Sequence, residues 1–522
     1  MPDVGSGVVL VGMPTSGKST VGRLVAERLG RPFLDTDELA AQRVGMPVAA
    51  YIERHGEAAY REEESKAVSV ACAVSGAVIS TGGGAVIDPL NRWALWHHGT
   101  VVWLDLPADQ LLRRLSADAI PRPTLQPYGA KRLATAMADR APAYRAADVR
   151  VDASGSAEDA AEQIVSHRGP LRGRRLFDAE VERHHPMGPP QGRLVMGIEL
   201  AGVSPQGVAV IDRRLLTAAP DLVRALGATA CLPIAAGERS KRLRTLERVL
   251  EWLSGERVER ETPLIAVGGG TIGDLAGTAA ALYARGLPLV HVPTTWLAQA
   301  DSSIGGKVAV DLSAAKNALG AFWPPVVTAS DVAALRSLPL HARRDGMAES
   351  VKAAIIGDPD LWRLLEARGR AALRTDEPAR YAIVERSARV KLAVCGRDPF
   401  ETGERRTLNL GHTIGHALEI ESGYRLPHGA AVGLGMRAVA AMAAGRGGDP
   451  DLAPRLNALL TDLGFTLRRT FDPAAVRTAM LADKKRRGDR QRWILPMEIG
   501  RVAEVDDVTD AELELGLRTI AA

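Results

Sequence analysis

The chain has 522 residues, which exceeds one ordinary domain, and its 46% apolar and 25% charged residues are normal for a folded protein of two or three domains. Because 66 Lys and Arg face 62 Asp and Glu, the net charge is only +4, and no basic tract with interleaved aromatics or long apolar run suggests nucleic-acid or membrane binding. Three widely spaced cysteines and the lack of a secretory-type leader favour a reduced, cytoplasmic protein.

Residues 1–168 alternate short apolar runs with helical patterns. The runs "GVVLVGM", "AVISTGGG" and "TVVWLDL" are typical of buried strands, whereas "KSTVGRLVAERLG" is typical of a helix. This alternation predicts an α/β domain, a parallel sheet with helices on both faces.

The first chemical motif is "GMPTSGKST", which fits G-x-x-x-x-G-K-[ST] between a strand and a helix. Backbone amides and Gly12, Gly17 and Thr20 would surround phosphates, Lys18 would reach the terminal phosphates, and Ser19 would ligate Mg²⁺. The strand and helix on either side disfavour a chance glycine-rich turn, so ATP with Mg²⁺ is the expected cofactor.

Further polar residues follow in the same domain. Asp35 and Asp37, in "FLDTDE", alternate along a strand, so one could organise Mg²⁺ and the other could accept a hydroxyl proton, although either could simply cap a helix. Arg61 and Arg145 could each pair with a carboxylate, and Arg122 lies between prolines in a lid-like segment.

These motifs together resemble shikimate kinase over nearly all of the first 165 residues, through "GMPTSGKSTVG", "LDTD", "GEAAYREEE", "STGGGAV", "PRP" and "RAPAYR". The resemblance implies that shikimate is held by Asp37, Arg61, Gly83 and Arg145. It also implies that Lys18 and Arg122 stabilise the transferring phosphoryl group, with Asp35 and Ser19 at Mg²⁺.

The rest of the chain begins after residues 169–193, an Arg-, Gly- and Pro-rich stretch without sustained periodicity that we interpret as a linker. Strand-like "GVAVID", "PLIAVGGG" and "PLVHVPTT" predict an α/β lobe over residues 194–335. From 336 to 522, "RYAIVERSARVKLAV" and "AAVGLGMRAVAAMAA" have helical periodicity and predict a mostly helical lobe.

A metal site is suggested in the helical lobe by "LNLGHTIGHAL", where His412 and His416 lie four residues apart. On a helix both would share one face, either as two ligands or as one ligand beside a catalytic group. Glu349 and His428 are the further candidates, and two His with a carboxylate make zinc the default metal.

The region from about residue 200 to the end resembles 3-dehydroquinate synthase. The matching segments are "GGGTIGDLAG", "YARG", "VPTTWLAQADSSIGGKVAVD", "KNALGAFWPP", "GMAESVKAAII", "LNLGHTIGHALE", "HGAAVGLGM" and "DKK". The resemblance implies that Glu349, His412 and His428 hold Zn²⁺ or Co²⁺, whereas His416 serves the substrate's phosphate and proton transfer. It also implies NAD⁺, the substrate 3-deoxy-D-arabino-heptulosonate 7-phosphate, and a homodimer through this half.

The remaining assignments also follow from that resemblance. NAD⁺ would be bound by Asp212, Glu238, Lys241, Gly269, Gly270 and Asp274. The substrate's phosphate would be bound by Lys307, Lys316, Asn317 and Lys484, with Arg285 from a partner subunit. Its carboxylate and ring would be bound by Arg405, Asn409, Lys352, Lys391 and Asp301.

The sequence therefore predicts a bifunctional enzyme, a shikimate kinase fused to a 3-dehydroquinate synthase. One alternative keeps the kinase and makes the second half a different sugar-phosphate cyclase, which would not need Arg405 and Lys391. A metal-dependent alcohol dehydrogenase has no use for so many phosphate-binding cations. The last alternative is a degenerate scaffold domain.

Overall fold

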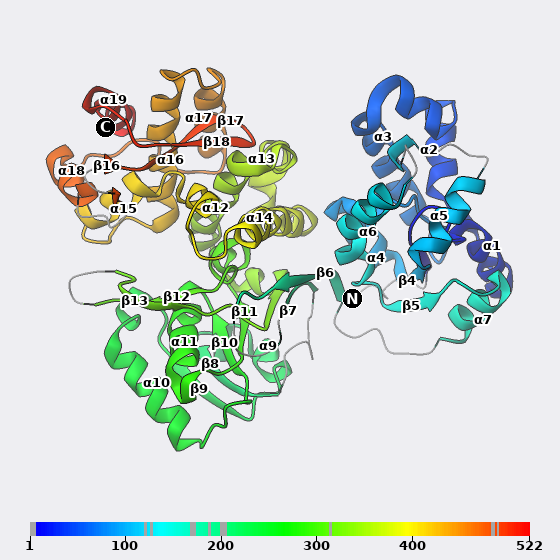
Figure 1. The fold of residues 1–522 in the computed structure, drawn as a ribbon, viewed down its shortest axis with the longest axis horizontal. Helices are drawn as coiled ribbons and strands as arrows, with labels where there is room; N and C mark the ends of the chain where they lie inside the picture. Colours follow the sequence, from blue (N-terminus) through cyan, green and yellow to red (C-terminus); the bar gives the residue numbers. More distant parts are fainter. Residues whose placement is uncertain are drawn as a thin grey trace. The chain divides into compact units, whose positions relative to one another are not determined.

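The computed structural model describes residues 7–118, 123–125, 129–167, 174–185, 189, 191–198, 206–312, 316–481, 486–487 and 490–522. The chain forms two compact units, one of Met1–Glu180 with Leu194–Leu200 and one of Val181–Arg193 with Ala201–Ala522. Both units are built from parallel sheets with helices, which confirms the predicted α/β fold class (Figure 1).

The first unit contains a five-stranded parallel sheet in the order β2-β3-β1-β4-β5. The central strand is completely apolar and buried, as a sheet covered on both faces requires. The strands are β1 (Gly7–Val11), β2 (Phe33–Asp35), β3 (Val78–Ser80), β4 (Gly99–Asp105) and β5 (Val149–Asp152). The α-helices are α1 (Lys18–Leu29), α2 (Thr36–Val44), α3 (Val48–Cys72), α4 (Pro89–His98), α5 (Ala108–Ala117), α6 (Ala130–Tyr144) and α7 (Ala157–Ser166).

A seven-stranded sheet in the order β6-β7-β14-β11-β10-β8-β9 runs through the next part of the chain. Its strands are β6 (Arg174–Glu182), β7 (Gln191–Ile198), β8 (Val208–Asp212), β9 (Ala230–Ile234), β10 (Leu264–Gly268), β11 (Leu289–Pro293) and β14 (Val327–Asp331). The helices of this lobe are α8 (Leu215–Ala218), α9 (Pro220–Ala225), α10 (Leu243–Gly255) and α11 (Gly270–Leu282), and a hairpin is formed by β12 (Lys307–Val310) and β13 (Leu319–Phe322).

Alternate residues of the central strands supply two separate cores, one on each face of this sheet. Leu264 and Ala266 of β10 join the larger cluster with α10 and α11, whereas Ile265 and Val267 join a smaller cluster that includes Leu215 of α8. Since side chains alternate along a strand, a continuous apolar run buries both faces.

The remainder of the second unit is mostly helical, in the yellow-to-red part of Figure 1. Its helices are α12 (Leu340–Gly357), α13 (Pro359–Ala372), α14 (Glu377–Arg397), α15 (His412–Glu421), α16 (His428–Ala444), α17 (Leu452–Asp462), α18 (Pro473–Leu481) and α19 (Asp510–Ile520). Short strands add β15 (Arg486–Arg487) with β16 (Arg490–Gln491), and β17 (Trp493–Glu498) with β18 (Arg501–Val505). No described helix is long and apolar enough to cross a membrane.

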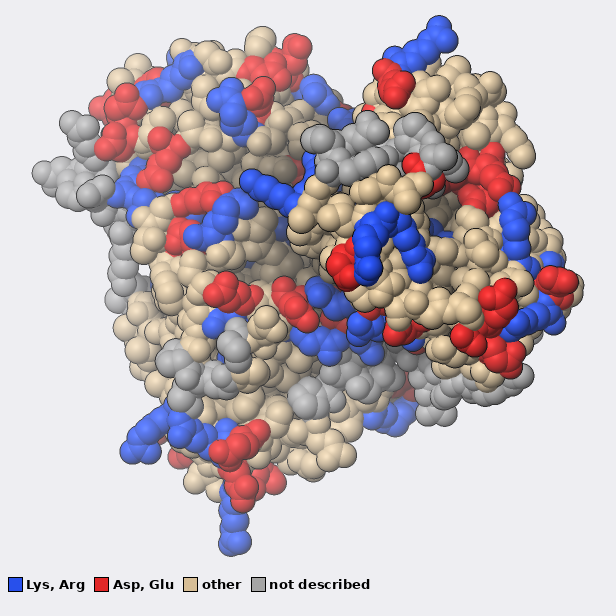
Figure 2. Space-filling view, turned by 45° about the vertical axis from the view of Figure 1, so that its right-hand side comes forward, with Lys and Arg blue, Asp and Glu red and all other residues tan. Residues whose placement is uncertain are grey.

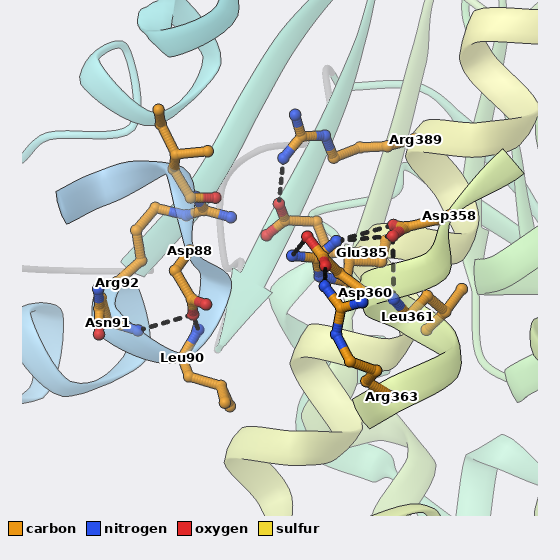
Figure 3. A network of polar contacts seen from close by, with 12 residues as sticks. Asp88, Leu90, Asn91, Arg92, Asp358, Asp360, Leu361, Arg363, Glu385 and Arg389 are labelled. Atoms are coloured by element: carbon orange, nitrogen blue, oxygen red, sulfur yellow. Dashed lines mark hydrogen bonds and ion pairs between the residues drawn. The ribbon is translucent and has the colours of Figure 1, made fainter. Parts of the chain in front are cut away.

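Aspartates fix the beginnings of several helices, as Figure 3 shows for two of them. Asp88 accepts from the amide of Leu90 at 2.6 Å and so caps α4. Asp358 accepts from the amide of Leu361 at 2.9 Å, capping α13, and also from Arg386 of α14 at 2.9 Å. Such caps satisfy amides that have no partner inside the helix.

Part of the expected linker, residues 169–193, is regular, because β6 lies inside it. Leu176 and Phe177 are buried, but the next residue along the strand is Asp178, which is only 3% exposed and pairs with Arg175 at 3.1 Å. A buried carboxylate paired with an arginine of its own strand interrupts the apolar pattern from which a strand would be predicted.

Candidate active sites

The first site is the glycine-rich loop between β1 and α1. Gly17, at φ 94°, is the N-cap of α1, so the loop leads directly into the helix N-terminus. Lys18 is buried, and its Nζ donates to the carbonyl oxygens of Gly12 and Met13 at 2.9 and 2.8 Å, folding the ammonium over the loop. A pocket of about 480 Å³ adjoins the loop and is lined by Pro14, Thr15, Gly17, Lys18, Ser19, Thr20, Asp35, Asp37, Thr81, Gly83, Arg114, Ala117 and Asp118.

Ser19 and Asp35 converge at one side of this pocket. The Ser19 hydroxyl donates to Oδ2 of Asp35 at 2.7 Å, while Oδ1 of Asp35 accepts from the amides of Asp37 and Glu38 at 2.9 and 3.4 Å. Asp35 is thus the N-cap of α2 as well as the partner of Ser19. A hydroxyl and a carboxylate oxygen are ligands that Mg²⁺ prefers, so this pair fits that ion.

Charged side chains from α3 lie behind Asp37. Arg61 pairs with Glu57 at 2.6 Å and with Glu64 at 2.7 Å. Burial raises the pKa of Glu64, although the neighbouring Arg61 opposes this. A Cβ at Gly84 would lie 2.3 Å from a nitrogen of Arg61, so the glycine loop packs directly on the guanidinium. Arg61 is therefore close to the loop that contains Gly83.

The two arginines of "RAPAYR" occupy different environments. Arg145 donates to the carbonyl of Asp178 at 3.2 Å and lies 3.5 Å from Glu180, both on β6, and it is not among the residues that line the pocket. Arg140 is 5% exposed and its guanidinium lies 3.5 Å from the Met13 sulfur of the phosphate loop. The predicted Arg122 lies outside the described residues.

The second site contains the predicted metal ligands. One nitrogen of His412, one of His428 and one carboxylate oxygen of Glu349 lie within 4.8 Å of one another. The Glu349 carboxylate is 3.0 Å from Nε2 of His428 and 3.4 Å from Nε2 of His412. A carboxylate and two imidazoles are a donor set that Zn²⁺ accepts, so the residues fit the ion.

The same set of histidines contains a second grouping. His416, Glu419 and His428 also have ligand atoms within 4.8 Å of one another, and Glu419 lies 3.4 Å from Nδ1 of His428. His416 packs edge-on against His412, with ring centroids 5.2 Å apart, but does not belong to the group with Glu349. His412 thus belongs to the group with Glu349, and His416 to the group with Glu419.

Burial and neighbouring charges shift the pKa values of the three candidate ligands. Burial raises the pKa of Glu349, but Lys352 and the two histidines outweigh this and hold it well below its usual range. Burial lowers the pKa of His412. For His428, hydrogen bonds to Glu349 and Glu419 overcome burial and raise the pKa to about 10.

Two lysines extend the site towards the α/β lobe. Lys352, 3% exposed, contacts Glu349 and lies 3.5 Å from Asp301. Lys391 of α14 lies 2.9 Å from the Asp301 carboxylate and donates to its backbone carbonyl at 2.7 Å. The structure thus brings together Asp301, Lys352 and Lys391 beside Glu349.

Lys307, predicted for the substrate's phosphate, and Asn409, predicted for its carboxylate, both contact one unpredicted residue, Glu401. Glu401 has a positive φ of 59°, contacts Lys307, and accepts from Nδ2 of Asn409 at 3.1 Å. Arg405 is 2% exposed and donates to the carbonyls of Pro399 and of Gly305, the latter at 2.7 Å. Lys307, Arg405 and Asn409 therefore form one basic and polar group.

The predicted dinucleotide loop begins α11, where Gly269 is the N-cap. A Cβ on Gly269 would lie 2.9 Å from Thr295, and one on Gly270 2.9 Å from Ser302, so only glycine leaves room there. Lys241 contacts Asp274 and Asn317. The half-buried helix N-terminus with small residues fits a pyrophosphate.

Other predicted residues are more dispersed. Asp212 binds Arg214 at 2.8 Å, and Lys316 lies 3.9 Å from Glu238 and 4.3 Å above the Tyr424 ring. Arg285 is exposed at the end of α11, with a left-handed φ of 63°. The predicted Lys484 lies outside the described residues.

Three residues that the sequence analysis did not select belong to these sites: Arg140, Glu401 and Glu419. Arg140 lies in the same motif as Arg145, and Glu419 follows His416 by three residues, so helical spacing could have indicated both. Glu401 has no local signal, since its role depends on Lys307, which is 94 residues away.

Comparisons with known proteins agree with this division. Residues 14–168 match the model of the shikimate kinase family, residues 231–345 that of the 3-dehydroquinate synthase N-terminal region, and residues 346–486 that of its C-terminal region. A 3-dehydroquinate synthase from Xanthomonas campestris pv. campestris (strain 8004) is 41% identical over 330 residues, 62% of this chain and 88% of that protein. A 2-epi-valiolone synthase from Actinosynnema mirum is 40% identical over 299 residues, 56% of this chain and 78% of that protein.

A solved structure shares the second unit's fold. The 2-epi-5-epi-valiolone synthase ValA of Streptomyces hygroscopicus subsp. jinggangensis 5008, with NAD⁺ and Zn²⁺ bound, is 27% identical and covers 65% of this chain and 98% of that one, with a TM-score of 0.60.

Proposed function

Since the chain belongs to the 3-dehydroquinate synthase family and its residues 14–168 match shikimate kinase, we propose that it is a bifunctional enzyme of the shikimate pathway. One activity phosphorylates the 3-hydroxyl of shikimate with ATP. The other converts 3-deoxy-D-arabino-heptulosonate 7-phosphate to 3-dehydroquinate and phosphate. The observation that carries the second activity is the Glu349, His412 and His428 group beside Asp301, Lys352 and Lys391.

In the kinase unit, the roles follow from the pocket. Lys18 and the amides of the loop would bind the transferring phosphate, with Ser19 and Asp35 at Mg²⁺. Asp37 lines the pocket and would accept the hydroxyl proton. We assign the shikimate carboxylate to Arg61 and Arg140, because Arg145 contacts β6 instead.

In the synthase unit, Glu349, His412 and His428 would hold Zn²⁺ or Co²⁺, and the α11 N-terminus with Asp212, Glu238 and Asp274 would hold NAD⁺. When bound, these groups supply transient oxidation of a ring hydroxyl and polarisation of its oxygen. Asp301 would orient that hydroxyl, and His416 would move a proton near the phosphate.

The ends of the substrate need cations, and the site provides them. Arg405 and Asn409 would bind the carboxylate, whereas Lys307, Lys316 and Asn317 would bind the phosphate, with Lys484. Glu401 contacts Lys307 and Asn409. The anionic groups of a bound substrate would therefore take the place of the Glu401 carboxylate beside these two residues.

We also infer a homodimer through the synthase unit, in which Arg285 enters the partner's site. The exposed side chain of Arg285 and its left-handed backbone support this, because a left-handed non-glycine residue is uncommon and such residues cluster at functional sites. A cytoplasmic location is supported by three free thiols, at Cys72, Cys231 and Cys395. On the face shown in Figure 2, basic and acidic side chains are interspersed.

The test measures phosphate release from 3-deoxy-D-arabino-heptulosonate 7-phosphate by the full-length protein, with mass spectrometry of the product. Formation of 3-dehydroquinate that requires both NAD⁺ and Zn²⁺ or Co²⁺ is expected. Glu349→Gln should abolish it, while Glu366→Gln, an exposed partner of Arg455, should not. Faster turnover of sedoheptulose 7-phosphate would instead assign a cyclase of the valiolone type, and no turnover of either sugar would leave a silent domain.

A further inference from the structure

Tyr60 of α3 contacts Asp37, the residue proposed to accept the hydroxyl proton in the kinase unit. Its ring is 4% exposed and packs in a small core with Ala40 and Ala67. Its hydroxyl donates to Oδ1 of Asp37 at 2.8 Å. A buried tyrosine hydroxyl needs such a partner, but a packing role alone does not require that the partner be the pocket's carboxylate.

The hydrogen bond from Tyr60 restricts the orientation of the Asp37 carboxylate. A Cβ on Gly82 would lie 2.6 Å from Oδ1 of Asp37 and 2.5 Å from Glu64, so both carboxylates approach the same glycine. The terminal torsion of an aspartate is otherwise broad, and its carboxylate plane turns easily. A rigid aromatic donor on Oδ1 fixes that plane.

The donor's lack of charge matters for a base. Glu64, which approaches the same glycine, is already paired with a cation, Arg61, at 2.7 Å. Tyr60 instead holds Asp37 through a neutral O–H group, which orients the carboxylate without adding a positive charge beside it.

We propose that Tyr60 is a positioning residue for phosphoryl transfer, holding Asp37 by Oδ1 so that its carboxylate is oriented to accept the proton of the attacking hydroxyl. This inference rests on the proposed kinase activity. Because proton transfer requires close alignment, losing the hydrogen bond should reduce the rate of the chemical step and leave substrate binding intact.

The experiment compares Tyr60→Phe with wild type in the full-length protein, measuring shikimate-dependent ATP turnover. We expect kcat to fall about tenfold, with the KM values for shikimate and ATP within about twofold. Tyr51→Phe is the matched control, since Tyr51 packs on the same cluster from the same helix and stacks on His55. It should leave kcat unchanged, and a thermal unfolding transition of the kinase unit equal to that of wild type shows that each variant is folded.

An unchanged kcat, or a rise in KM that accounts for the whole loss, would overturn the proposal. A second measurement repeats the change in the Asp37→Asn background with labelled ATP. There Tyr60→Phe should have no further effect, because the residue it positions is already altered, and an undiminished tenfold loss would assign Tyr60 a role independent of Asp37. Absence of shikimate-dependent turnover in wild type would refute the kinase itself, a different outcome from either of these.

Discussion

At the scale of single residues, Arg140 and Arg145 show how one motif can contain both a site residue and a structural one. Five helical positions separate them, which turns their side chains about 140° apart around the axis. Arg140 therefore reaches the phosphate loop, whereas Arg145 reaches β6. The motif could be recognised from the sequence, but the motif alone left open which arginine reaches the phosphate loop.

This difference predicts opposite results for two matched substitutions. Arg140→Lys should raise the KM for shikimate about tenfold, because lysine keeps the charge but loses the fork that binds a carboxylate at two points. Arg145→Lys should leave that KM within about twofold. Steady-state kinetics with varied shikimate measures both, and the reverse pattern would restore the assignment of Arg145 to the substrate.

A pH dependence is expected from Asp398, which orders the loop before Arg405. Burial raises the pKa of its carboxyl, but amides of Arg405, Thr402 and Gly403, at 3.0, 2.9 and 2.7 Å, outweigh this and lower it to about 2. A depressed folded pKa stabilises the protein above the unfolded value near 3.9, and this stabilisation is lost as the pH falls towards 2.

Asp398→Asn should therefore reduce the free energy of unfolding of the second unit by about 2 kcal/mol at pH 7. The difference from wild type should narrow between pH 5 and pH 3, because the wild-type carboxyl begins to bind its proton there in the unfolded chain. Urea titrations across that range measure it. A difference independent of pH would mean that the amide replacement disturbs packing and not charge.

At the scale of elements, α12 and α16 depend on each other. Asp345, four residues before Glu349 on α12, accepts from the amide of Gly429 at 2.6 Å, in the first turn of α16. No side chain of α16 itself caps that end. The contact fixes where α16 begins, and its first residue is the ligand His428.

Asp345→Ala should lower the free energy of unfolding by about 1 kcal/mol, as the loss of a helix cap does, and weaken Zn²⁺ binding about tenfold by releasing His428. Competition with a chromophoric chelator measures the affinity without relying on catalysis. Ser156→Ala removes a comparable cap from α7, in the other unit, and should leave Zn²⁺ affinity unchanged. Equal losses in both variants would contradict a specific role for Asp345.

The elements themselves differed in how far the sequence could predict them. The strands β1, β8 and β10 are continuous apolar runs, and their glycine-rich endings mark the phosphate and dinucleotide loops, so pattern alone located them. β6 could not be located in this way. Its buried Asp178 pairs with Arg175 of the same strand and interrupts the apolar run, and its backbone carbonyl accepts from Arg145, 33 residues away, a contact that leaves no local trace.

At the scale of the whole molecule, the two sites belong to separate compact units. Their proposed reactions are not consecutive, so neither product is the other site's substrate. Lys18→Ala should therefore abolish shikimate phosphorylation and leave the synthase rate unchanged, and Glu349→Gln should do the converse. Both assays on each purified variant measure this, and a rate change in the unaltered activity would reveal communication between the units.

The two activities could be predicted from the sequence because each depends on long motifs whose residue types are set by phosphate, metal and carboxylate chemistry. The limits of the units could not. The first unit extends to Glu180 and also includes residues 194–200. Its limits therefore depend on contacts between residues and not on the change in composition near residue 169.

That boundary affects how the enzyme can be dissected. A kinase fragment ended where the family match ends, at residue 168, would leave Arg145 without the Asp178 carbonyl and Glu180, and Asp148 without Arg174 at 3.5 Å. A synthase fragment begun after β6 would leave β7 without its neighbour in the sheet. Residues on both sides of β6 therefore depend on it, so an expression fragment of either enzyme should include this strand.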